Sequence, residues 1–224
     1  MIDNIIQIDY LFKEIDEKLD TPINIYLIGG VVLLTNNLRK ITKDIDAIVT
    51  SRIDYLKLKK IFAKLGFIES KPTKEYSRFN LSQIFIRKDY RVDLFERIVC
   101  KQLFLSKNMM LRAKLYKTYN HISIYFCSNE DIFVFKSLTD RDGDVIDCIN
   151  LAQKKIDWKI ILSEIKFQIK LSGNEVWVTW FEERLNLMED KGLIIPIIKE
   201  IRKLSEKYYL ELEDQFANKS KNKN

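Results

Sequence analysis

The sequence has little of what disulfide-bonded, membrane-spanning or histidine-dependent proteins need. Its three cysteines are widely spaced and odd in number, so neither a disulfide framework nor a zinc knuckle is expected. No apolar run approaches the ~20 residues that cross a bilayer, and the first residues lack the pattern of a secretory signal. The one histidine, His121, has no nucleophile motif around it, which favours a structural role. We therefore expect a cytoplasmic protein with no membrane partner.

The composition is otherwise that of an ordinary globular chain. Of 224 residues, 46% are hydrophobic and 31% are charged, which excludes a wholly disordered protein. Lysine and arginine exceed the acids by 38 to 32, and residues 97–129 contain no acid at all. This basic stretch is either a solvated surface or a face that attracts a triphosphate or an RNA backbone. Its cations are Arg97, Lys101, Lys107, Arg112, Lys114 and Lys117.

Hydrophobic patterning predicts an α/β arrangement in the first half of the chain. Tyr90–Val99 follows another strand candidate after the polar pair Lys88-Asp89, so these two strands are expected to be antiparallel. Gly66 closes one of the expected helices. Strands are expected at 23–28, 45–49, 79–87, 90–99 and 121–126, and helices at 5–19, 31–39 and 55–65.

The chain changes character near Ser128, where the strand patterns stop. The expected fold class is α+β, with a small mixed β-sheet domain and flanking helices over 1–128, followed by a C-terminal helical domain over 129–217. The last residues, 218–224, contain no apolar side chain and are expected to be disordered. Helices of the second domain are expected at 130–138, 144–152, 158–171, 175–188 and 195–216.

Residues that carry chemistry gather between Tyr26 and Val49. A strand runs into Gly29-Gly30, a short helix follows, and a second strand opens with Asp44-Ile-Asp46. Because residues two apart on a strand share a face, the two carboxylates lie side by side. Hard oxygen ligands of this kind suit Mg²⁺ or Mn²⁺. Glycines let the backbone approach phosphate oxygens, and a helix N-terminus directs N–H groups at the anion.

A third acid, Asp93, interrupts the otherwise apolar end of the strand Arg91-Val-Asp-Leu-Phe. A buried carboxylate is costly unless it is paired or bound to a metal. If this strand lies beside that of Asp44 and Asp46, the three acids hold two metal ions for an in-line phosphoryl displacement. The hypothesis requires Asp93 to face the other acids and not to be paired with an arginine. The alternative is that these acids are helix caps and surface residues.

In this order, the motifs between Tyr26 and Asp93 resemble the DNA polymerase beta-like nucleotidyltransferase superfamily. The resemblance implies that Gly29 and Gly30 form the glycine motif and contact the nucleotide. It implies that Asp44 and Asp46 bind the metal and the triphosphate of an NTP substrate. It further implies that Asp93, the third metal-binding carboxylate, helps to activate an acceptor hydroxyl. The implied reaction moves a nucleoside monophosphate to that acceptor and releases pyrophosphate.

One residue departs from the family pattern. Many members place a small polar residue after the glycines to contact phosphate, whereas Val31 stands there in this chain. Val31 favours an alternative function, in which a catalytically inactive module with the nucleotidyltransferase fold binds a nucleotide, RNA or a protein partner.

A second segment narrows the resemblance. Lys136, Arg141, Asp144 and Asp147 are spaced as in the abortive-infection nucleotidyltransferases, which are the toxins of some toxin–antitoxin pairs. The resemblance implies that Lys136 contacts the nucleotide phosphates, that Asp144 lies close to the pocket, and that an antitoxin is a partner. The residues alone equally favour Asp144 as part of a helix cap. The acceptor is RNA (tRNA being favoured), a protein side chain or a small molecule.

Overall fold

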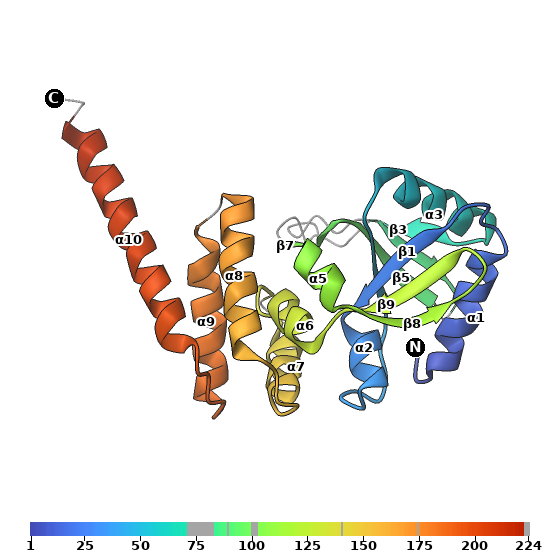
Figure 1. Cartoon of the computed structure of the whole chain (residues 1–224), viewed down its shortest axis with the longest axis horizontal. Coiled ribbons are helices and arrows are strands. Elements are labelled where there is room, and N and C mark those ends of the chain that lie inside the picture. Colours follow the sequence, from blue (N-terminus) through green and yellow to red (C-terminus); the bar gives the residue numbers. More distant parts are fainter. Residues whose placement is uncertain (71–82, 89, 100–102, 140, 174, 222–224) are drawn as a thin grey trace. The chain divides into compact units, whose positions relative to one another are not determined.

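The computed structural model describes residues 1–70, 83–88, 90–99, 103–139, 141–173 and 175–221, with side chains described as far as residue 215. The chain divides into two compact units, Met1–Ser128 and Asn129–Asn224 (Figure 1). The first contains a mixed sheet with helices, and the second is helical. The predicted α+β class with a mixed sheet and C-terminal helices is confirmed.

The first unit is built on a sheet in the order β3-β4-β5-β2-β1-β9-β8. Its central strands, β1 (Ile23–Ile28) and β2 (Ile45–Val49), have the predicted bounds and are almost wholly buried. β1 is antiparallel to β2 and parallel to β9, while β2 is parallel to β5, which makes the sheet mixed. The other strands are β3 (Ile68–Ser70), β4 (Ile84–Arg87), β5 (Tyr90–Glu96), β8 (Lys114–Thr118) and β9 (Ile122–Phe126), with β6 (Ile98–Val99) and β7 (Leu103–Phe104) forming a separate pair.

Strands β4 and β5 form the antiparallel pair that the sequence predicted. The predicted second strand ends early, because Arg97 has a left-handed φ of 62° that separates β5 from β6. The beginning of the predicted first strand, residues 79–82, lies outside the described residues, as do Asp89, Cys100 and Lys101. Strands β3, β6, β7 and β8 were not predicted as separate strands, because each is short or exposed.

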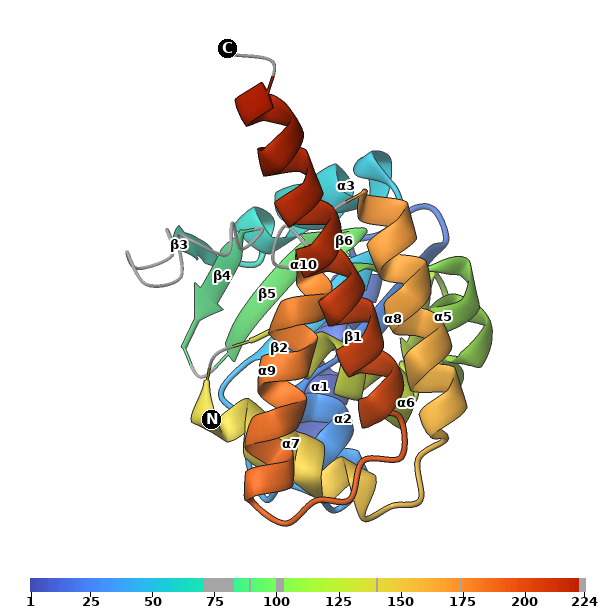
Figure 2. The same cartoon turned by 90° about the vertical axis from the view of Figure 1, so that its left-hand side faces the viewer.

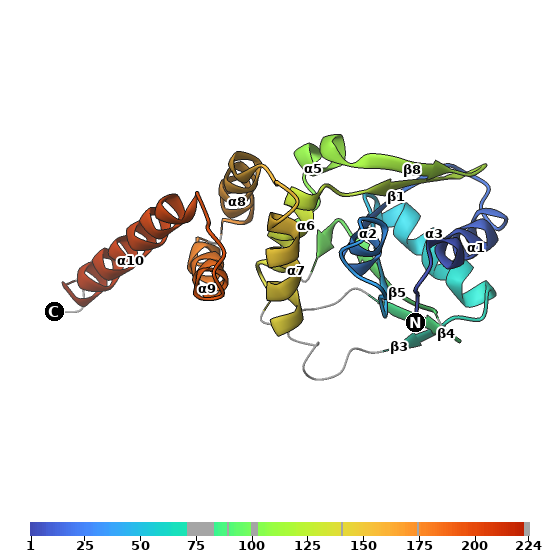
Figure 3. The same ribbon diagram turned by 90° about the horizontal axis from the view of Figure 1, so that it is seen from below.

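The helices of the first unit are α1 (Ile5–Asp16), α2 (Gly30–Thr35), α3 (Arg52–Lys64) and α5 (Lys107–Arg112). α1 and α3 lie side by side (Figure 3). α3 begins at Arg52, earlier than predicted, because the side chain of Ser51 accepts a hydrogen bond from the N–H of Asp54. α2 ends earlier than the predicted Arg39, since the left-handed Asn37 (φ 57°) turns the chain.

A buried carboxylate joins α1 to the hairpin of β8 and β9. Asp16 accepts hydrogen bonds from the backbone N–H groups of Asn120, His121 and Ile122, at 3.1, 2.7 and 2.9 Å. Three donors on one carboxylate satisfy an acid that is 4% exposed. The end of the first helix therefore depends on a turn that lies more than a hundred residues later in the chain.

The second unit consists of α6 (Asn129–Lys136), α7 (Asp142–Ala152), α8 (Trp158–Ser172), α9 (Trp177–Asp190) and α10 (Ile198–Lys221). α9 packs against α8 and α10 (Figure 2). α10 continues through residues 218–221, which we expected to be disordered, because adding a residue to an existing helix costs little. Residues 222–224 lie outside the described part. Among the described residues, no helix is long and apolar enough to cross a membrane.

Candidate functional site

Two of the predicted carboxylates lie next to each other on the central strands of the first unit. Asp46 on β2 is in register with Asp93 on the parallel neighbour β5, and with Ile28 on the antiparallel neighbour β1. Residues in register on adjacent strands point to the same face, so the two carboxylates share one face of the sheet. Asp46 is half-buried and Asp93 is 3% exposed. The sheet thus places the Asp93 strand directly beside that of Asp46, as the sequence hypothesis requires.

The two glycines bring the backbone against this face. A Cβ atom built on Gly29, which has a φ of 69°, would lie 2.2 Å from Oδ2 of Asp46. A Cβ atom on Gly30 would lie 2.1 Å from Oγ1 of the buried Thr42, whose hydroxyl donates a 3.2 Å hydrogen bond to the carbonyl oxygen of Asp44. Any larger side chain would displace these groups. The diglycine therefore lets the start of α2 contact both Asp46 and the loop that carries Asp44.

An arginine that the sequence hypothesis did not assign lies among these acids. Nε and Nη2 of Arg91 donate hydrogen bonds of 2.8 and 2.7 Å to the two carboxylate oxygens of Asp93. These hydrogen bonds, together with the negative charges of Asp93, Asp44 and Asp46, raise the pKa of the Arg91 guanidinium. All three acids therefore act on one cation. The spacing of Arg91 and Asp93, two residues apart on one strand, already placed them on the same face.

The three-carboxylate hypothesis fails one of its two conditions in this structure. Asp93 faces the same side of the sheet as Asp46, but it is paired with an arginine, which the hypothesis excluded. Among the described residues, no three acidic, histidine or cysteine side chains lie close enough together to hold a metal ion. The oxygen donors of Asp44 and Asp46 have the chemistry that suits Mg²⁺.

Lys136 and Asp144, the predicted nucleotide-binding pair, lie together in the second unit. Nζ of the buried Lys136 donates to Asp144 and is 2.7 Å from Oδ2 of Asp147. Asp144 also accepts hydrogen bonds from Thr139 and from Nε of Arg141. Burial opposes the ionised forms, yet the charges of Asp144 and Asp147 raise the pKa of Lys136, and Lys136 and Arg141 lower that of Asp144. This network joins α6 to α7.

The structure does not show the helix cap that was the alternative interpretation of Asp144. Asp144 lies in the first turn of α7, but the N-cap residue is Arg141 and no side chain caps the helix by a hydrogen bond. The charge of Lys136 is already balanced by two acids within its own unit. A role for Lys136 and Asp144 in nucleotide binding stays a prediction.

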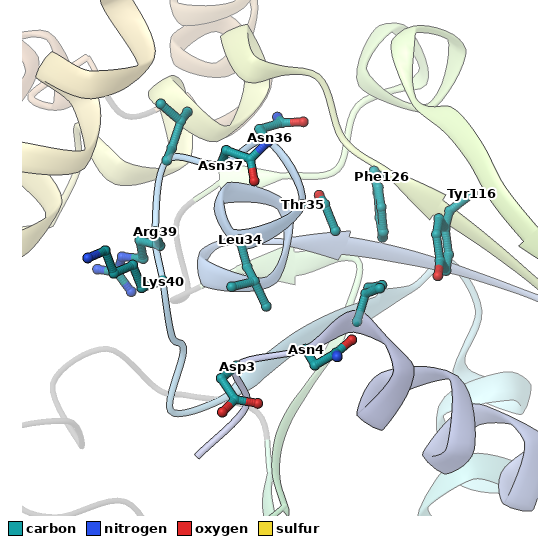
Figure 4. Close-up of a pocket in the computed structure, with 12 residues that line it drawn as sticks. Asp3, Asn4, Leu34, Thr35, Asn36, Asn37, Arg39, Lys40, Tyr116 and Phe126 are labelled. Carbon is teal, nitrogen blue, oxygen red and sulfur yellow. The ribbon is translucent and has the colours of Figure 1, made fainter.

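A separate cavity of about 990 Å³ opens beside the C-terminal end of α2 in the first unit. Figure 4 shows Arg39 and Lys40 on one side of it and the parallel rings of Tyr116 and Phe126 on the other. Neither Asp46 nor any other predicted site residue lines it. Its walls are formed by Asp3, Asn4, Ile5, Leu34, Thr35, Asn36, Asn37, Leu38, Arg39, Lys40, Tyr116 and Phe126.

Comparisons with known proteins place the fold. No protein-family model matches the chain, and no curated protein matches it in sequence. A solved structure that resembles it is the crystal structure of ANT(2")-Ia, an aminoglycoside nucleotidyltransferase, in complex with adenylyl-2"-tobramycin. The match has a TM-score of 0.50 and 10% sequence identity, and it covers 75% of this chain and 98% of the other. The chain therefore has a fold similar to that of a nucleotidyltransferase.

Proposed function

We propose that this protein is a nucleotidyltransferase that moves a nucleoside monophosphate from an NTP to an acceptor hydroxyl. The observation that carries the proposal is the register of Asp46 with Asp93 on adjacent parallel strands, with Gly29 packed against Asp46. The similarity of fold to a nucleotidyltransferase supports it. RNA, with tRNA favoured, is the preferred acceptor class, and a protein side chain is the alternative.

Each residue has a chemical role in this proposal. Gly29 and Gly30 keep the backbone close to Asp46 and leave room for the triphosphate beside it. Asp93 accepts the proton of the acceptor hydroxyl, once Arg91 has released it. Asp44 and Asp46 would hold Mg²⁺ or Mn²⁺, which when bound neutralises charge on the phosphates and on the attacking and leaving oxygens.

Arg91 has a role that the sequence hypothesis lacked. In the described structure it neutralises Asp93 and lies within the field of the other two acids. A divalent cation that binds Asp44 and Asp46 would repel the guanidinium and weaken its hold on Asp93. Until substrate binds, the positive charge of Arg91 reduces the repulsion among the three acids. Its ion pair with Asp93 also offsets the desolvation cost of burying that carboxylate.

The direct test is label transfer from α-³²P-labelled NTPs in the presence of Mg²⁺ and total RNA. Asp46→Asn is expected to reduce transfer by about 100-fold or more, because loss of metal-stabilised charge costs several kcal/mol in the transition state. The matched control is Asp20→Asn, which removes an exposed acid of the same type from the same unit. Transfer by Asp46→Asn at the rate of the unchanged protein would refute the proposal.

The ion pair of Arg91 and Asp93 favours a second candidate, a catalytically inactive module that binds a nucleotide or a partner. In that protein Arg91 permanently occupies the third carboxylate, and Val31 offers no hydroxyl to phosphate. The variant Arg91→Gln separates the two candidates. An enzyme is expected to retain transfer when Asp93 is freed, whereas a binding module shows NTP binding and no transfer either before or after the change.

The remaining proposals concern the role of the protein in the cell. The proposed toxin role implies an antitoxin protein and a cytoplasmic location. Expression from an inducible promoter is expected to arrest growth, and Asp46→Asn is expected to relieve the arrest. Growth that stops equally with both proteins would contradict a toxin role based on nucleotidyl transfer.

A further inference from the structure

The cavity beside α2 combines aromatic, cationic and amide groups in one place. The rings of Tyr116 and Phe126 are stacked, with centroids 4.5 Å apart and planes inclined by 15°. The hydroxyl of Tyr116 donates a 3.2 Å hydrogen bond to Asp9, so the orientation of this ring is fixed from outside the cavity. The half-buried ring pair therefore presents a preformed flat wall.

Two basic residues, Arg39 and Lys40, line the part of the cavity opposite this wall. Lys40 is exposed and forms no ion pair with any described residue, and Arg39 lies beside it (Figure 4). Lys114 is the register partner of Phe126, so its side chain projects from the same sheet face as that ring. Asp3 is the one acid in the lining. The lining thus contains two basic residues and one acid.

Amide side chains supply a third kind of contact. Asn36 and Asn37 line the upper part of the cavity in Figure 4. An amide both donates and accepts hydrogen bonds, as the edges of nucleobases require. A flat ring surface, amides and cations together match a base and its phosphate, whereas an acidic peptide would need the cations alone.

The cavity is close to the proposed catalytic residues but does not include them. α2 begins at Gly30 and its last turn, with Leu34 and Thr35, lines the cavity. Six residues of helix span about 9 Å. The acid-free stretch continues outward from the cavity along β8 and α5, which lie next to each other in sequence and in space (Figure 3).

We propose that this cavity binds a nucleotide unit of single-stranded RNA, with the base stacked on the Tyr116–Phe126 wall and the phosphates near Lys40 and Lys114. A use of this site in holding the acceptor strand rests on the proposed nucleotidyl transfer, but RNA binding does not. The same chemistry exists in a free nucleotide, and the experiment separates the two sources.

The test measures fluorescence anisotropy of a labelled, unstructured 12-nucleotide RNA without Mg²⁺ or NTP. Phe126→Leu keeps an apolar side chain but removes the stacking face, and is expected to weaken binding by about tenfold or more. Lys40→Glu is expected to weaken binding and to reduce the slope of log K against log salt by about 0.7 per lost phosphate contact. Asp3→Asn is expected to tighten binding, a gain that misfolding does not produce.

Two control variants match these changes elsewhere in the chain. Lys60→Glu alters the net charge as Lys40→Glu does, but on α3, which does not line the cavity. Phe167→Leu removes a partly exposed aromatic ring from α8. Both controls are expected to bind RNA as the unchanged protein does.

The proposal is overturned if Phe126→Leu and Lys40→Glu bind RNA normally, or if Lys60→Glu weakens binding as much as Lys40→Glu. It is also overturned if AMP competes as tightly as the oligonucleotide binds, since the ligand is then a free nucleotide. Asp46→Asn is expected to keep RNA binding while losing transfer. Failure of RNA binding with intact transfer therefore refutes this inference and leaves the proposed nucleotidyl transfer standing.

Discussion

Replacing Gly29 with alanine tests the close contact on which the proposed site depends. An L-residue at a φ of 69° costs about 1–3 kcal/mol in backbone strain. The new Cβ atom would lie 2.2 Å from Oδ2 of Asp46, and overpacking of this kind costs a further ~1–3 kcal/mol. We expect the first unit to lose roughly 2–6 kcal/mol of stability, and the transfer activity to fall because Asp46 must move.

Two other glycines separate the contributions. Gly66 has a φ of 79° with no atom within 4 Å of its added Cβ, so Gly66→Ala carries only the strain, about 1–2 kcal/mol. Gly143 in α7 has neither feature, and Gly143→Ala is expected to stabilise the helix by about 0.5–1 kcal/mol. The excess loss for Gly29→Ala over Gly66→Ala contains the contact with Asp46 together with the extra backbone strain of a residue whose ψ is −143°.

Amide hydrogen exchange of peptides from β1 and β2 is the appropriate assay. All three tryptophans, Trp158, Trp177 and Trp180, lie in the second unit, so tryptophan fluorescence does not report on the unit that is changed. Exchange measures the free energy of opening locally. An opening free energy for Gly29→Ala within about 0.5 kcal/mol of that for Gly66→Ala would refute the close packing of Gly29 on Asp46.

Further predictions concern the second unit. Lys136→Met removes the buried cation that Asp144 and Asp147 share, leaving only the half-exposed Arg141 on Asp144. It is expected to destabilise the unit by about 3–5 kcal/mol, measured by tryptophan fluorescence in urea; a loss below ~1 kcal/mol would contradict the buried network. In the folded protein the pKa of Asp144 is lowered and that of Lys136 is raised. The stabilisation that their ion pair contributes to the folded state is therefore fully present between about pH 4 and pH 10. It is lost as the pH falls through the folded-state pKa of Asp144 or rises through that of Lys136, so acid is expected to destabilise the unchanged protein more than Lys136→Met. Burial raises the pKa of the Cys148 thiol to about 12, so alkylation at pH 8, followed by mass spectrometry, is expected to require urea; equal rates with and without urea would contradict this.

The buried central strands and the longer helices were predictable from sequence. β1 and β2 have the predicted bounds because each is a dense apolar run, and the turn residues that flank it mark where the strand begins and ends. β8 was not predictable in the same way. It is an edge strand with charged and exposed side chains, and hydrogen bonds to β9 create it. Such an element depends on a neighbour that the local sequence does not reveal.

The candidate site was predictable in its components but not in its charge balance. The alternation of side chains along each strand is local information, and it predicts which residues of that strand share a face with Asp46 or with Asp93. The register of the two strands then places Asp46 and Asp93 on the same face. The pairing of β2 with β5 is non-local, and so is the strength of the field that Arg91 experiences. Lys136 shows the same limit, since its spacing to Asp144 fits either a phosphate contact or an internal ion pair.

The hydrogen bonds between Asp16 and the turn before β9 have a consequence for synthesis on the ribosome. β1 is complete at Ile28, but its parallel neighbour β9 and the amides that Asp16 binds are translated only around residues 120–126. The emerging polypeptide must therefore carry an open strand edge while almost a hundred further residues are made. An open edge of this kind invites pairing with other chains. Nascent molecules stalled before the β8–β9 hairpin are expected to be the species most prone to aggregate and to require chaperones.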